Sequence, residues 1–157
     1  MDREFFMENR KALYNMTEEK GLLLLFSGHA PKKTNDENYP FFADRNYMYF
    51  TGVHQENTIL MTEIYGKEQW EEALYILPPD LMAERWTGRR IKPEEVEEQS
   101  GIRECASTEN FRKDLENRLM NKGFAHGDIL SSARPPDDSF LYLPQRPPAF
   151  QNPYRLW

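Results

Sequence analysis

Residues 41–52 read FFADRNYMYFTG and residues 83–90 read AERWTGRR. In the first stretch Tyr47 and Phe50 have helical spacing, so we predict that both side chains enter a hydrophobic core. In the second stretch Trp86 is followed by a polar sequence that contains glycine. A tryptophan in such a turn is seldom fully buried, and exposed aromatic residues commonly anchor contacts with a partner. An interface or substrate role for Trp86 and a role in the core are therefore both open.

Short apolar runs on either side of these stretches have the character of strands. Residues 22–26 read LLLLF without alternation, which is typical of a strand buried on both faces of a sheet. Residues 57–65 and 73–77, joined through Gly66, predict an antiparallel pair. Residues 128–130 are a last, short strand candidate.

Helical patterns alternate with these strands. The residues expected to face the core in the first and last helices recur near four-residue spacing: Phe5, Ala12, Leu13 and Met16, then Phe111, Leu115 and Leu119. Asp44, Asp80 and Pro93 mark the starts of shorter helical segments, and Ser107 or Thr108 marks the start of the last helix. Because strands and helices interleave along the chain, the sequence predicts the α/β class with layered elements.

Length and composition describe one acidic domain. The chain has 157 residues, is 39% hydrophobic and carries a formal charge of -6, which permits a single core of ordinary size. The negative net charge argues against nucleic-acid and anionic-membrane partners, because binding to either needs a positively charged face on the protein. The single cysteine excludes an internal disulfide, and the first residues have no signal-peptide pattern. We therefore expect a cytoplasmic protein without a membrane partner.

The chain shows no pattern typical of a catalytic centre. Its three histidines, His29, His54 and His126, are too far apart in the sequence to share a helix face as metal ligands do. Glycine-rich nucleotide loops and the Gly-x-Ser-x-Gly motif of serine hydrolases are absent from the sequence. Cys105 has no histidine near it, so we interpret it as a structural thiol. The sequence thus predicts no catalytic residue, no metal site and no cofactor bound by this chain alone.

The two quoted stretches resemble the N-terminal domain of Xaa-Pro aminopeptidases, which belong to the creatinase/prolidase, or pita-bread, metallopeptidase family. Residues 49–52 match the Tyr-Leu-Thr-Gly-like element of that domain, and residues 86–90 match its Trp-x-Gly-x-Arg element. The hairpin and the helices follow in the family's order, so the resemblance covers most of residues 1–132. Phe42 and Ala43 depart from the pattern, because some members have Arg-Gln at these two positions.

This resemblance implies a ribonuclease H-like α/β/α sandwich with a mixed sheet of about five or six strands. Residues 1–132 would form the domain, and residues 133–157, rich in proline and aromatic side chains, would begin the connection to a catalytic domain. In several family members the tryptophan that matches Trp86 reaches into the active site of a neighbouring subunit. Trp86, Arg90 and His54 are therefore the candidates for a substrate pocket or subunit interface.

The resemblance also implies an activity for a longer parent protein, in which this chain would be the non-catalytic part. The parent would be a homodimer or higher oligomer that removes an N-terminal residue preceding proline. Two manganese-like metal ions in its catalytic domain would polarise the amide and activate water. One alternative is a stand-alone, non-catalytic module that binds peptides or proteins, as in histone-chaperone subunits that resemble inactive family members. The choice among aminopeptidase, dipeptidase and creatinase substrates for the parent also stays open.

Overall fold

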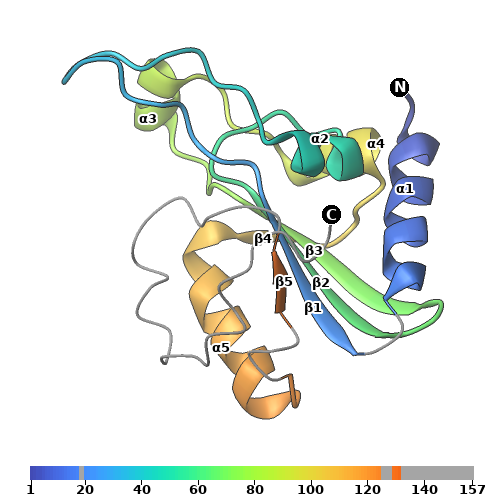
Figure 1. The fold of residues 1–157 in the computed structure, drawn as a ribbon. Coiled ribbons are helices and arrows are strands. Elements are labelled where there is room, and N and C mark those ends of the chain that lie inside the picture. The colour runs from blue at the N-terminus through green and yellow to red at the C-terminus, as the bar shows by residue number, and fades with distance from the viewer. Residues whose placement is uncertain (18–19, 125–128, 132–157) are drawn as a thin grey trace.

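The computed structural model of this protein describes residues 1–17, 20–124 and 129–131. Five strands form one sheet in the order β4-β3-β2-β1-β5, and helices lie on both of its faces (Figure 1). The elements in chain order are α1 (Arg3–Met16), β1 (Gly21–Phe26), α2 (Arg45–Thr51), β2 (Ile59–Gly66), β3 (Gln69–Ile76), α3 (Leu81–Thr87), α4 (Pro93–Ser100), β4 (Cys105–Ser107), the 3-10 helix η1 (Thr108–Asn110), α5 (Phe111–Asn121) and β5 (Ile129–Ser131).

The hairpin of β2 and β3 forms the middle of the sheet. β1 pairs antiparallel with β2, and β2 pairs antiparallel with β3, while β5 and β4 run parallel to β1 and β3. The predicted mixed sheet and its expected number of strands are confirmed. β3 begins earlier than residue 73, and β4 was not predicted. Asp128 of the predicted last strand and residues 133–157 lie outside the described residues.

β1 is buried along its whole length, as its unbroken apolar run predicts. Leu23 and Leu25 pack in the core on the face covered by α1, α2 and α4. Leu22, Leu24 and Phe26 point to the other face, which α5 covers. Figure 1 shows this arrangement, with α5 on the opposite side of the sheet from α1. The fold is therefore an α/β/α sandwich, as predicted.

The predicted buried face of α1 was right only at Leu13. Phe5 is half-buried, and Ala12 and Met16 are exposed. The residues that α1 buries are Phe6, Arg10, Leu13 and Tyr14. These positions follow the spacing i, i+4, i+7 and i+8, so the stripe is regular but contains a charged residue. Arg10 can lie in this stripe because β3 supplies a carboxylate beneath it, which the sequence of the helix cannot reveal.

α2 is the helical turn predicted in the first quoted stretch. The Asp44 carboxylate accepts hydrogen bonds from two backbone amides of the first turn, each at 3.0 Å. Tyr47 and Phe50 are buried, as predicted. Gly52 ends the helix with a φ of 68°, and a Cβ at this position would lie 2.4 Å from the Phe6 ring. Glycine is therefore required here both for its backbone conformation and for the packing of α1 against α2.

The later helices begin and end at the predicted signals. α4 starts at Pro93 and is followed by Gly101, which has a φ of 78°. The Ser107 hydroxyl accepts a hydrogen bond from the Glu109 amide at 3.3 Å and so caps η1, which continues into α5. Gly123, with a φ of 72°, follows the end of α5. Among the described helices, none is long and apolar enough to cross a membrane.

Truncation of Leu115 tests the packing of α5. Its side chain is 1% exposed and lies in the core on the α5 face of the sheet. We expect Leu115→Ala to lower the free energy of unfolding by about 2 kcal/mol or more, because it leaves a cavity. Urea denaturation measures the change. Met120→Ala, on the same helix but 81% exposed, is the matched control and is expected to be nearly neutral. Equal stability of Leu115→Ala and the unaltered chain would contradict this packing.

Candidate functional site

The residues predicted for a contact site all lie beyond one end of the sheet. Because β1, β2 and β3 alternate in direction, the end of β1, the start of β2 and the end of β3 meet there. His54 lies in the connection from β1 to β2, whereas Trp86 and Arg90 lie in the connection from β3 to β4. Figure 1 shows α3 projecting from this end, away from the sheet.

α3 forms from local signals alone. Pro78 and Pro79 end the preceding strand, because neither residue can donate to a strand ladder. Asp80 is the predicted N-cap, and its carboxylate accepts hydrogen bonds from two amides of the first helical turn, each at 3.0 Å. Gly88 follows the helix with a φ of 93°. The sequence thus specifies both ends of α3 without any contact to the core.

The apolar side chains of α3 are open to solvent. α3 buries none of its residues, and Leu81, Met82 and Trp86 are 81%, 67% and 88% exposed. We call these three side chains the α3 patch. Short helices gain most of their stability by packing an apolar face, and large apolar side chains grouped on a surface are typical of contact sites. The predicted exposure of Trp86 is confirmed.

Arg90 ties the base of this projection to the end of β3. Its Nη1 donates a hydrogen bond to the carbonyl oxygen of Pro78, while its buried Nε has no hydrogen-bond partner within the described ranges. A shallow hollow beside the guanidinium is lined by Pro79, Asp80 and Thr108, among others. A buried N–H without an acceptor is costly. Arg90 therefore anchors this segment through Nη1, while its Nε is closed off from solvent.

His54 lies on the segment that neighbours Arg90. The side-chain oxygen of Gln55, the next residue, accepts a hydrogen bond from the Ile91 amide at 3.1 Å. The exposed imidazole packs on Phe41, with 5.0 Å between the ring centroids. The structure thus brings the segments of His54 and Arg90 together. In the part of the chain that is described, no hydrogen bond or ring contact links Trp86 to either of them.

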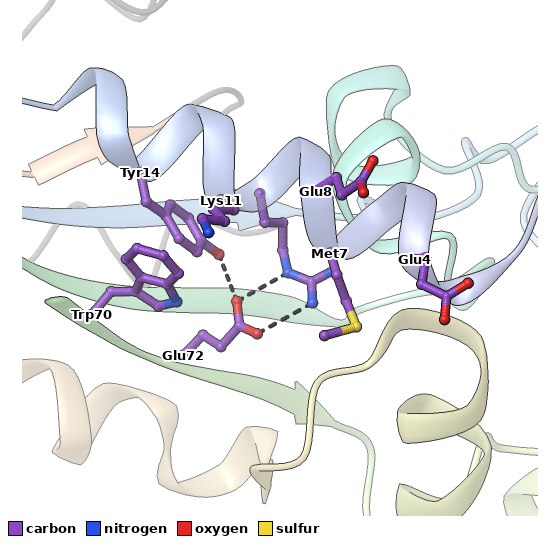
Figure 2. A pocket seen from close by; sticks show the side chains of 8 residues that line it. Glu4, Met7, Glu8, Lys11, Tyr14, Trp70 and Glu72 are labelled. Carbon is purple, nitrogen blue, oxygen red and sulfur yellow. Dashed lines mark hydrogen bonds and ion pairs between the residues drawn. The ribbon is translucent and has the colours of Figure 1, made fainter. Parts of the chain in front are cut away.

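A second hollow lies between α1 and β3 and contains a buried polar network (Figure 2). Arg10 donates to both carboxylate oxygens of Glu72, at 3.0 and 3.2 Å, and to the carbonyl oxygen of Phe50 at 2.9 Å. The Tyr14 hydroxyl donates to Glu72 at 2.8 Å and lies 2.9 Å from the Thr62 hydroxyl. Sequence reasoning missed this network, because nothing in the sequence of α1 shows that Glu72 lies beneath Arg10.

The electrostatics of this network indicate a structural role. Burial, followed by the nearby Glu72 carboxylate, raises the pKa of Tyr14 well above its ordinary value. The phenol therefore stays protonated and works as a hydrogen-bond donor. Arg10 and Glu72 satisfy each other in a bidentate pair, which is the strong geometry for these groups. All members of the network are engaged, so it holds α1 on the sheet and presents no reactive group.

The remaining chemistry-bearing side chains also give no reactive centre. Over residues 1–17, 20–124 and 129–131, no three histidine, cysteine, aspartate or glutamate side chains are grouped so as to hold a metal ion. Burial, with a smaller contribution from Glu104, raises the pKa of the Cys105 thiol to about 11. A protonated thiol is a poor nucleophile. That this chain binds no metal or cofactor stays a prediction.

The sequence matches a known family over most of its length. Residues 6–125 match the family model described as the N-terminal domain of aminopeptidase P. The chain belongs to this family. The predicted resemblance is therefore confirmed.

Individual relatives support the same assignment. An Xaa-Pro aminopeptidase of Haemophilus influenzae is 34% identical over 122 residues, which cover 77% of this chain and 28% of the relative. An Xaa-Pro aminopeptidase of Escherichia coli K12 is 26% identical over 102 residues, covering 65% of this chain and 23% of the relative. The chain therefore spans about a quarter of the length of these relatives.

Solved structures agree with the fold. A structure from Bacillus anthracis described as an aminopeptidase P superposes with a TM-score of 0.79 and 28% identity, covering 96% of this chain and 34% of that chain. This aminopeptidase P N-terminal domain thus has the family's fold, and the predicted site residues lie on its projecting end. Trp86 is exposed to solvent in the structure, so its side chain is accessible to a partner. The roles of Trp86, Arg90 and His54 stay predictions.

Proposed function

We propose that this domain is the non-catalytic N-terminal part of an Xaa-Pro aminopeptidase, in which it supports subunit association and completes the substrate pocket of a neighbouring subunit. The exposed α3 patch is the observation that carries the proposal. A capped helix that buries none of its own residues presents an 88% exposed indole. Buried in a partner, an aromatic side chain of this kind supplies a large share of the contact energy.

The neighbouring residues fit the same role. Arg90 binds the carbonyl oxygen of Pro78 at the base of α3 and would hold the α3 patch in position for a contact, and the exposed His54 lies on the adjoining segment. Trp86 would close the pocket over a proline-containing peptide, because an indole supplies a large apolar contact area. The assembly would be a cytoplasmic homodimer or a higher oligomer.

The metal chemistry belongs to another part of the parent in this proposal. Two manganese-like ions would polarise the scissile amide and activate water there. The described residues of this domain do not fit such ions, since they contain no suitable group of three ligands. The contribution of this chain is therefore limited to shape, contact and positioning.

A stand-alone binding module of the same fold is the second candidate. The α3 patch favours it as well, because an exposed apolar face suits any protein partner. The reading frame downstream of this chain separates the two candidates. A following domain with spaced Asp, Asp, His, Glu and Glu ligands supports the aminopeptidase, and a different continuation supports the module.

The chain alone is expected to hydrolyse no proline-containing peptide and to bind no stoichiometric Mn²⁺. The reason is that its described residues lack a cluster of metal ligands. Calorimetric titration with Mn²⁺ and a peptidase assay with and without EDTA measure both properties. Stoichiometric binding together with EDTA-sensitive hydrolysis would contradict the assignment of a non-catalytic part.

A further inference from the structure

The outer edge of β3 is only partly covered. β4 pairs with β3 at Leu74, Tyr75 and Ile76. The preceding part of β3, from Gln69 to Ala73, pairs with β2 on its inner side and has no strand beside it on its outer side among the described residues. An uncovered strand edge is a template for pairing with another extended chain.

The hydrogen-bonding groups of this edge point outward. The Leu74 amide donates to the carbonyl oxygen of Glu104 at 2.9 Å, so Leu74 directs its backbone groups toward the β4 side. Strand geometry has a period of two residues, and the N–H and C=O groups of Trp70 and Glu72 therefore point the same way. Neither residue has a backbone partner on that side within the described part of the chain.

A groove runs over this edge on the α1 side. Its lining includes Met7 and Tyr14 of α1 together with Trp70 and Glu72 of β3 (Figure 2). The rings of Tyr14 and Trp70 lie 5.2 Å apart, measured between centroids, and Met7 is exposed. A strand paired with the edge would direct every second side chain into this groove. These side chains would contact Met7 and Trp70, beside the paired side chains of Arg10 and Glu72.

The charge at the edge is negative on both faces. Glu4 and Glu8 line the groove and have no ion pair among the described residues. On the other face the Glu71 side chain is 70% exposed and has a long ion pair, 3.9 Å to Lys122, whose closer partner is Glu63 at 3.0 Å. The two cations of the groove, Arg10 and Lys11, are already paired with glutamates. Among the described residues that line the groove, carboxylates without an ion pair thus lie beside cations that are already paired, which favours a basic partner over an acidic one.

We infer that the outer edge of β3 binds an extended peptide segment that alternates apolar and basic side chains, by adding it to the sheet as a strand. The apolar side chains would enter the groove under α1, and the basic ones would lie beside Glu71. A second copy of this chain is the less suitable occupant. In the register that pairs Trp70 of one copy with Glu72 of the other, antiparallel pairing would set the two Glu71 carboxylates opposite each other, which destabilises a ladder.

Amide hydrogen exchange, followed by NMR on the full 157-residue chain, tests the edge directly. Without ligand, the amides of Trp70 and Glu72 are expected to exchange much faster than those of Glu71 and Ala73, which face β2. A six-residue peptide of alternating valine and lysine is expected to protect Trp70 and Glu72 selectively. The same peptide N-methylated at its edge-facing amides should give no protection. Slow exchange of the Trp70 and Glu72 amides in the free chain would overturn the inference. This holds whether the slow exchange occurs at every protein concentration or only at high ones.

Charge reversal tests the chemistry of the partner. Glu71→Lys is expected to weaken binding of the valine–lysine peptide by about fivefold and to strengthen binding of a valine–glutamate peptide by a similar factor. Glu71→Gln should give an intermediate affinity. Glu37→Lys, which makes the same change of net charge on a remote and exposed glutamate, is the matched control and should leave both affinities unchanged. Equal binding of the two peptides by the unaltered chain would overturn the proposed basic partner.

Discussion

Replacing Arg10 by methionine is expected to lower the free energy of unfolding by about 3 to 4 kcal/mol. The guanidinium is 3% exposed and binds both oxygens of Glu72, whose side chain is 19% exposed. Methionine fills a similar volume but donates no hydrogen bond. The substitution therefore leaves the Glu72 carboxylate and the carbonyl oxygen of Phe50 without their cation, in a site that water barely reaches.

Urea denaturation of three further variants isolates this effect. Lys11→Met removes the neighbouring cation of α1, which is 56% exposed and pairs with Glu68 at 3.4 Å, and is expected to cost less than about 0.5 kcal/mol. Glu72→Leu tests the other partner, and Arg10→Met combined with Glu72→Leu is expected to regain at least half of the loss, because no unpaired charge remains. If Arg10→Met were as mild as Lys11→Met, the network would not hold α1 on the sheet.

Local signals were sufficient to predict much of the fold. Asp80, Pro93 and Gly101 act on their own helix ends, so their effects can be recognised without knowing what lies nearby. The LLLLF run of β1 indicated a strand buried on both faces, and both faces are indeed covered. The match of residues 49–52 and 86–90 to family elements supplied the rest of the architecture.

Features that depend on distant partners were missed. β4 has three residues and becomes a strand because β3 pairs with it. Arg10 and Glu72 are 62 positions apart, so neither residue reveals that the other is buried beside it. The same limit caused the error on the buried face of α1.

The candidate site combines features that the local sequence determines with features that depend on distant partners. The exposure of Trp86 followed from its own glycine-containing context. The link between Arg90 and Pro78, and the bond that joins the segments of His54 and Arg90, depend on how two connections meet at one end of the sheet. No periodicity in the sequence encodes that meeting. The exposure of Leu81 and Met82 beside Trp86 likewise became visible only in the structure, where the core lies elsewhere.

Trp86→Ala is expected to reduce kcat/KM for proline-containing peptides by roughly 30-fold in the Xaa-Pro aminopeptidase that we propose as the parent of this domain. In our proposal the indole contacts the substrate pocket of a neighbouring subunit, and its loss removes a contact made to the substrate or transition state. Because the side chain is 88% exposed in this domain, the substitution is expected to change the stability of the domain by less than about 0.5 kcal/mol.

Trp70→Ala provides a control with the opposite signature. Trp70 is half-buried and packs on Tyr14, so its truncation is expected to lower the melting temperature while leaving kcat/KM nearly unchanged. If Trp86 belonged to the core, its truncation would have the same signature, with a loss of about 3 to 5 kcal/mol in the free energy of unfolding. Comparing the two variants therefore separates a contact role from a packing role.

The most direct measurement is kcat/KM and melting temperature determined together on Trp86→Ala, with metal content checked in the same preparation. We predict a roughly 30-fold lower kcat/KM at unchanged melting temperature and unchanged metal content. Normal kcat/KM in a stably folded variant would contradict the proposal that this domain completes a neighbour's substrate pocket.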